Sequence, residues 1–222
     1  ETTMANRSTT GFGLRAAMRL GNTGSIQGQS KYAIKSGLGV GIFKNNPASI
    51  QLAGDTGYIQ DSGFSTTDDG NDGGIDFTSA NDALLVGVHN GVFFIDGTTS
   101  KPTFANSVAA SATFGTNPNT GSTDGVAFVN DDPLQEYIVK TDAACGQALF
   151  GLAGNMNDFA AGDAKDGQST STFDTGTQAV TAMFRIVRSA EDPDNEDLTA
   201  AGANIVVVMN SAANQYINGR DA

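Results

Sequence analysis

The stretch Ala83-Leu84-Leu85-Val86-Gly87-Val88-His89-Asn90-Gly91-Val92-Phe93-Phe94-Ile95-Asp96 carries the strongest structural signal in the chain. It consists of two apolar runs on either side of Asn90-Gly91, and short runs rich in valine and phenylalanine are typical of buried β-strands. Two structures satisfy the pattern: a hairpin with a type I′ turn at Asn90-Gly91, or one long strand with a bulge at the glycine. Both place this stretch inside a β-sheet.

Further strand signals surround this stretch and extend to the end of the chain. Alternation of apolar and polar residues, or short apolar runs, predicts strands over residues 31–35, 40–43, 49–52, 57–60, 126–129, 135–140, 179–188 and 205–209. The strand over 135–140 is expected to return from the one over 126–129 through a turn at Asp131-Asp132-Pro133, and the last two strands are expected to be central. With 28 glycines and few helix signals, the chain is predicted to be all-β, with a β-barrel or β-sandwich body that is β-tulip-like.

Three polar stretches divide this body. Residues 105–125 form a connection rich in Ser, Thr, Asn and Gly, which predicts one or two subdomains, the first over 31–110 and the second over 111–222. Residues 61–82 are expected to form an exposed insertion, and residues 146–176 an irregular loop. The acidic run at 191–197 is expected to be a solvated loop.

The first 30 residues differ from the rest in pattern and in charge. They show no sustained period, yet they contain scattered apolar residues, which predicts an extended arm that orders on a partner. Residues 1–44 carry six basic residues and one acid, a net charge of +5, while the remainder carries six basic residues against 23 acids, a net charge of −17. A basic head on an acidic body favours docking on an acidic protein surface over nucleic acid, because phosphates would be repelled by the body.

Signals for catalysis, metals and cofactors are weak throughout. The one histidine, His89, lies in the most apolar stretch, and the one cysteine, Cys145, is expected to be a small buried residue. The loop from Asp68 places Gly70 where an EF-hand needs an oxygen ligand, and Gly11-Phe12-Gly13 does not follow a strand as a dinucleotide site requires. No apolar run approaches the roughly 18 residues of a membrane span. We therefore predict no enzyme, no metal, no cofactor and no membrane partner.

Several segments, taken in order, resemble a family of small virion structural proteins of tailed bacteriophages, especially marine short-tailed ones. The residues that carry the resemblance are Asn6–Leu14, Val86–Phe94, Thr98–Phe104, Val126–Pro133, Val206–Asn210 and Gln215-Tyr216. The resemblance implies a capsid decoration (cement) protein: a β-rich homo-oligomer, with a trimer favoured, that sits on the outer surface of the virion capsid. Its implied partner is the major capsid protein, and its implied role is to stabilise the shell by bridging capsomers.

The arm and this resemblance together give a specific hypothesis for the capsid contact. Apolar side chains of the arm are expected to bury against capsomers while its arginines pair with carboxylates. The residues so assigned are Arg7, Phe12, Leu14, Arg15, Arg19 and Leu20. The alternative is a surface adhesive or host-recognition module of a virion, with the loops at 61–82 and 155–178 as its contact surface.

Overall fold

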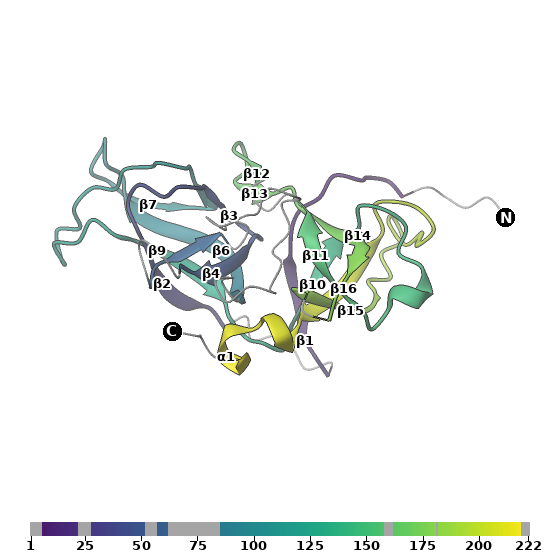
Figure 1. Ribbon diagram of the computed structural model, residues 1–222. Coiled ribbons are helices and arrows are strands. Elements are labelled where there is room, and N and C mark those ends of the chain that lie inside the picture. The colour runs from purple at the N-terminus through teal and green to yellow at the C-terminus, as the bar shows by residue number, and fades with distance from the viewer. Residues whose placement is uncertain are drawn as a thin grey trace.

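The computed structural model describes residues 6–21, 28–51, 57–61, 85–157, 162–180 and 182–218. The chain is all-β with antiparallel sheets, so the predicted fold class is confirmed. Figure 1 shows two lobes side by side, each built on one six-stranded sheet. Helical structure in the described residues is limited to the short turns η1 (Gln147–Leu149) and η2 (Ser211–Ala213) and to α1 (Gln215–Asn218).

The first lobe holds the strands from the middle of the chain. Its sheet has the order β2-β9-β6-β4-β5, with β7 also paired to β6. Its strands are β2 (Ser30–Ile34), β4 (Pro47–Ile50), β5 (Ile59–Asp61), β6 (Leu85–Ile95), β7 (Pro102–Ala105) and β9 (Gly125–Asn130). A small pair, β3 (Ile42–Phe43) with β8 (Ser107–Val108), packs beside this sheet.

The second lobe combines one strand from the N-terminal segment with strands from the last third of the chain. Its sheet has the order β1-β10-β16-β15-β11-β14. Its strands are β1 (Arg15–Arg19), β10 (Gln135–Lys140), β11 (Ala153–Asn157), β14 (Thr172–Gln178), β15 (Phe184–Ser189) and β16 (Asn204–Met209). A separate hairpin joins β12 (Gly162–Asp163) to β13 (Gln168–Ser169). The paired strands of neither sheet close into a barrel within the described ranges.

The structure of β6 decides between the hairpin and the bulged strand that its sequence left open. Residues 85–95 form one continuous strand, and the pairing with β9 shifts register between His89 and Gly91, so a bulge and not a hairpin occupies Asn90-Gly91. β6 also connects the two cores. Val86 and Val92 face the core of the first lobe, whereas Leu85 and Val88 pack into the core of the second.

Three sequence predictions about strands are wrong. The strand predicted over 179–188 begins only at Phe184, as β15, and the other two depend on tertiary pairing. The expected return strand, β10, pairs with β1 and β16 in the other sheet, because β9 already has β2 and β6 on its two edges. The region 146–176, expected to be an irregular loop, contains β11, β12 and β13 and most of β14. β14 lies at the margin of its sheet, and β12 and β13 form a separate two-stranded sheet. Such strands need no apolar alternation on their solvent side, so their sequences resemble loops.

The path of the chain shows where it crosses from one lobe to the other. The chain leaves the first lobe after β9 and enters the second at β10, so it passes between lobes over residues 131–134. The predicted insertion at 61–82 lies outside the described residues except for Asp61, which ends β5.

Candidate interaction surfaces

The described part of the predicted arm, residues 6–21, is extended but lies along the body of the protein itself (Figure 1). The Asn6 side-chain amide donates hydrogen bonds to the carbonyl oxygens of Asp197 and Ala201, each at 2.9 Å. The buried Lys140 ammonium donates to the Ser8 carbonyl at 2.9 Å. The body thus supplies the partner on which this segment orders.

The glycines that superficially matched a dinucleotide fingerprint have a structural role. A Cβ atom at Gly11 would lie 2.2 Å from the Thr170 carbonyl oxygen, and one at Gly13 would lie 2.5 Å from the Asn45 carbonyl oxygen. Gly13 also has a positive φ of 68°, which disfavours any larger residue. Both positions require glycine because the segment runs against backbone on each side.

The acidic run at 191–197 also holds the N-terminal segment. The Arg7 guanidinium pairs with the Asp194 carboxylate at 2.9 Å, and both side chains are exposed. An exposed ion pair of this kind contributes at most about 1 kcal/mol. The Asp192 carboxylate accepts hydrogen bonds from the Asp194 backbone N–H and the Asn204 amide, and these bonds hold its pKa below the usual value. This loop is therefore held by hydrogen bonds and binds the N-terminal segment, in addition to facing solvent.

Phe12 and Arg15 interact with each other on the protein surface. The Arg15 guanidinium lies 4.5 Å from the centre of the Phe12 ring, and the Lys140 ammonium lies 5.7 Å from the same ring. These distances are those of cation–π contacts. Burial lowers the pKa of Lys140, and the nearby Arg15 charge lowers it further, while Asp192 opposes the shift. Phe12 is half-buried and Arg15 is exposed.

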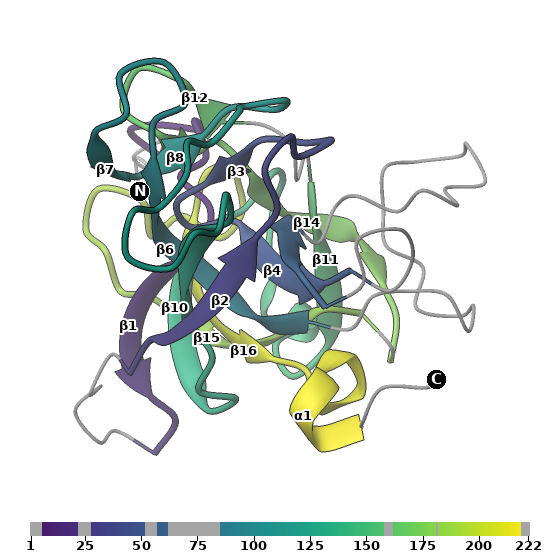
Figure 2. The same cartoon turned by 90° about the vertical axis from the view of Figure 1, so that its left-hand side faces the viewer.

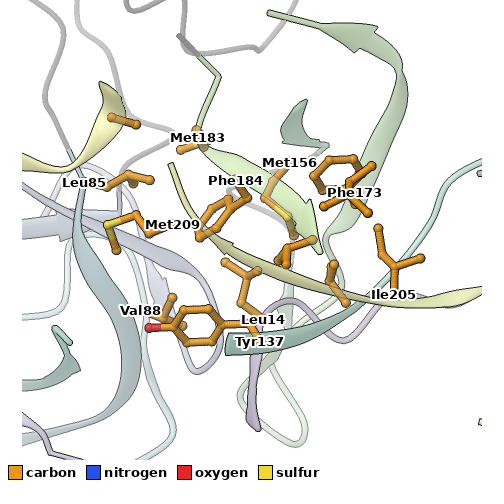
Figure 3. Packing of buried hydrophobic residues seen from close by; sticks show 14 of the residues in the cluster. Leu14, Leu85, Val88, Tyr137, Met156, Phe173, Met183, Phe184, Ile205 and Met209 are labelled. Carbon is orange, nitrogen blue, oxygen red and sulfur yellow. The ribbon is translucent and has the colours of Figure 1, made fainter. Parts of the chain in front are cut away.

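Leu14 is not available for a capsid contact in this structure. Its side chain is fully buried in the core of the second lobe. Figure 3 shows it beside Tyr137 and close to Val88. The expectation that Leu14 packs against a capsomer is therefore revised, because the sequence identified an apolar residue that needs burial but not the surface that buries it.

The end of β1 presents a small apolar surface next to a basic side chain. Met18, Leu20 and Leu134 are 46%, 41% and 41% exposed. The Leu20 backbone N–H donates to the Leu134 carbonyl oxygen at 2.8 Å, so the two segments lie together. Arg19 lies between Met18 and Leu20 in sequence, and its guanidinium pairs with the Asp132 carboxylate at 3.0 Å. We call Met18, Arg19, Leu20 and Leu134 the β1 edge surface.

A second exposed apolar surface crosses the first lobe. Phe104 on β7 is 75% exposed, and its ring centre lies 4.6 Å from that of Phe93 and 6.4 Å from that of Phe128. Strand register continues the surface, because Phe93 lies opposite both Phe104 and Val126. We call Phe93, Phe104, Val126 and Phe128 the aromatic row. It contains no acidic residue, although the chain has a net charge of −12, and Lys31 lies opposite Phe128 at its margin.

Sequence reasoning assigned Arg19 and Leu20 to an interaction surface but missed Leu134 and the aromatic row. A leucine directly after Asp131-Asp132-Pro133 was one available signal, because an apolar residue in a polar turn is often exposed. The aromatic row could not be identified from the sequence, because Phe93 and Phe128 lie in strongly apolar strands. Only the register shows that their side chains face away from the core.

The two residues with the greatest intrinsic reactivity are both buried. His89 is enclosed within the first lobe, and burial lowers its pKa to about 4, so it is neutral at pH 7. Its Nε2 lies 3.2 Å from the Gln60 carbonyl oxygen, which makes Nε2 the protonated nitrogen. Burial also raises the pKa of the Cys145 thiol to about 11, which disfavours the reactive thiolate.

Metal ligands do not gather in the described residues: no group of three or more His, Cys, Asp or Glu side chains there is placed to hold an ion. The predicted contact loops of an adhesive module fall partly outside the described ranges, since residues 62–84 and 158–161 are not described. No helix in the described ranges has the length and apolar content to cross a bilayer.

The chain matches no family model, and no curated protein and no solved structure is significantly similar to it. The features that bear on function are therefore the two exposed surfaces and the charge of the chain.

Proposed function

We propose that this protein is a non-enzymatic capsid decoration protein, which binds the outer surface of a phage shell and stabilises it by bridging capsomers. The observation that carries the proposal is the β1 edge surface. It gathers three exposed large apolar side chains and one arginine from segments distant in sequence. Apolar contact flanked by arginine is the composition of protein-binding surfaces.

Charge supports the choice of a protein partner. Met18, Arg19 and Leu20 of the β1 edge surface lie in the basic N-terminal region, while residues 45–222, which include Leu134, carry a net charge of −17. The acidic body repels other negatively charged surfaces and keeps coated particles apart in solution. The basic region is then the part of the molecule best suited to approach an acidic surface of the major capsid protein.

The proposed oligomer uses a different surface, the aromatic row. Exposed aromatic rings lose contact with water when copies associate, and they stack on identical rings in a symmetric interface. Because the row contains no acidic residue and has Lys31 at its margin, it is a place where two acidic chains meet without direct repulsion between carboxylates. Self-association would also multiply weak shell contacts through effective concentration.

Substitution of Leu20 by Asp is expected to weaken binding to undecorated phage shells at least about tenfold. It removes an apolar contact and puts a charge in the interface, and a loss of about 1.4 kcal/mol of binding free energy corresponds to a factor of ten. The measurement is co-sedimentation of the purified full-length protein with shells at low and moderate salt. Wild-type binding should be saturable and should weaken as salt rises, because Arg19 contributes.

The matched control is Leu152→Asp, which changes a leucine of similar exposure (44%) that is not part of the β1 edge surface. This variant should bind shells as the wild type does. Equal binding by Leu20→Asp and wild type would remove the β1 edge surface from the proposal, and absence of wild-type binding would remove the function itself.

Substitution of Phe104 by Ser is expected to raise the dissociation constant for self-association at least about tenfold, since it removes the most exposed ring of the aromatic row. Sedimentation velocity over a concentration series measures this directly. Val180→Ser, at an exposed valine outside the row, serves as the control and should leave association unchanged. A wild-type chain that stays monomeric at every concentration would contradict the proposed oligomer.

A further inference from the structure

A cleft of about 180 Å³ lies where the two lobes meet. Its walls come from the start of β1, the turn before β4, the middle of β6, the end of β9 and β10. The cleft volume is well above that needed for a single water molecule, so the cleft can receive a small side chain. The lining residues are Leu14, Arg15, Ala16, Lys44, Asn45, Val88, His89, Asn90, Asn130 and Tyr137.

The charge of this cleft is opposite to that of the protein. Arg15 and Lys44 line it, and no lining residue is acidic, although the chain as a whole carries −12. Neither side chain forms an ion pair with another residue in the described part of the chain. Lys44 is half-buried, and Arg15 is exposed.

Asn130 supplies an independent indication that this cleft receives a ligand. Its side chain is 5% exposed, and its Oδ1 has no hydrogen-bond partner among the described residues. Asn130 lies opposite Val88 in the β6–β9 ladder, so both side chains are on the same face, and both line the cleft. The Tyr137 hydroxyl is already used, because it donates to the Asn130 backbone carbonyl at 3.1 Å.

The lining residues therefore favour a ligand that carries two kinds of chemical group. Arg15 and Lys44 favour a negative group, and the Asn130 Oδ1 atom needs an N–H or O–H donor. An acidic residue within a peptide provides both, because its carboxylate faces the cations while a backbone amide N–H reaches the buried oxygen. Nucleic acid is disfavoured, since its many phosphates would meet the acidic body.

We infer that the cleft between the lobes is a binding site for an acidic peptide segment. The segment places an Asp or Glu carboxylate between Arg15 and Lys44 and donates a backbone N–H to Asn130. The inference does not depend on the proposed capsid role, because any protein partner with such a segment would fit. Binding there would also tie the two lobes together, since Arg15 belongs to one and Lys44 and Asn130 to the other.

Titration of the ¹⁵N-labelled full-length protein with the blocked peptide acetyl-Gly-Glu-Gly-amide tests the inference without any shell. We expect saturable shifts in the amide resonances of Arg15, Lys44 and Asn130. The matching peptide with Gln in place of Glu should bind at least about tenfold more weakly, because charge-assisted hydrogen bonds are about twice as strong as neutral ones.

Two variants locate the site. Lys44→Met should weaken binding of the Glu peptide at least about tenfold, whereas Lys101→Met, at an exposed lysine outside the cleft, should not change it. Asn130→Asp should weaken it as well, because a negative charge would replace a neutral acceptor. Equal binding of the Glu and Gln peptides, shifts confined to other residues, or no saturable shift at the highest soluble peptide concentration would overturn the inference.

Discussion

Substitution of Leu14 by Ala is expected to lower the free energy of unfolding by about 2–5 kcal/mol. Leu14 is fully buried among Tyr137, Val88 and other core side chains of the second lobe. Removal of its side chain leaves a cavity at the point where the N-terminal segment enters the core. Urea unfolding followed by circular dichroism measures the loss.

The control for this substitution is Leu20→Ala, six residues further along the same segment. Leu20 is exposed on the β1 edge surface, so its truncation should change stability by no more than about 0.5 kcal/mol. If Leu14→Ala lowered the free energy of unfolding no more than Leu20→Ala does, the N-terminal segment would not be part of the folded core. The sequence prediction of a separate arm would then hold.

Substitution of Arg188 by Met is expected to destabilise the protein by about 3 kcal/mol. The Arg188 guanidinium makes two hydrogen bonds to the Glu136 carboxylate, at 2.8 and 2.7 Å, across the intervening strand β16. The Glu136 side chain is 2% exposed, so loss of its partner leaves a buried charge, which typically costs about 3–5 kcal/mol. The lower value applies because Arg188 is 46% exposed.

Two further variants separate charge burial from loss of packing. Arg185→Met removes an arginine from the same strand that bonds only neutral groups, the Gly151 carbonyl and the Asn210 side chain, and should cost about 1 kcal/mol. The double variant Glu136→Met/Arg188→Met should recover most of the lost stability, because no unpaired charge remains. A double variant as unstable as Arg188→Met alone would show that the destabilisation has another cause.

The features of the fold that follow from local pattern were predictable. β16 is buried along its whole length and β6 along most of its length, and the apolar runs in their sequences predicted both strands. The strand β14 was not predictable in this way, because its residues Asp174 and Gly176 are of types depleted in strands. Pairing with β11 holds it in place, and such pairing is visible only once the sheet is assembled.

The candidate surfaces were predictable only in part. Charge counting located the basic N-terminal region, and Arg19 and Leu20 do lie on an exposed surface. The same counting did not distinguish Leu20 from Leu14, since both are leucines in a segment without clear periodicity. The two leucines differ in burial. Leu14 is buried because Asn45 and Ser171 bind its segment through backbone hydrogen bonds and because Tyr137 belongs to the same core, and all three residues come from distant parts of the chain.

This distinction changes how the capsid proposal is best tested. Deletion of residues 1–30 would remove β1 and Leu14 along with the exposed side chains, so loss of binding by the truncated chain would only report damage to the second lobe. Single substitutions on the β1 edge surface leave the core intact. Figure 2 shows that β1 lies at the periphery of the molecule, with its end directed away from the body.

The most direct test of the central claim is a cryo-electron microscopy reconstruction of undecorated phage shells incubated with saturating full-length protein. The account predicts ordered density on the outside of the shell, with the β1 edge surface turned toward the capsomers and the aromatic row in contacts between copies. Bare shells at saturation, or a body docked through a face remote from Leu20 and Leu134, would contradict it.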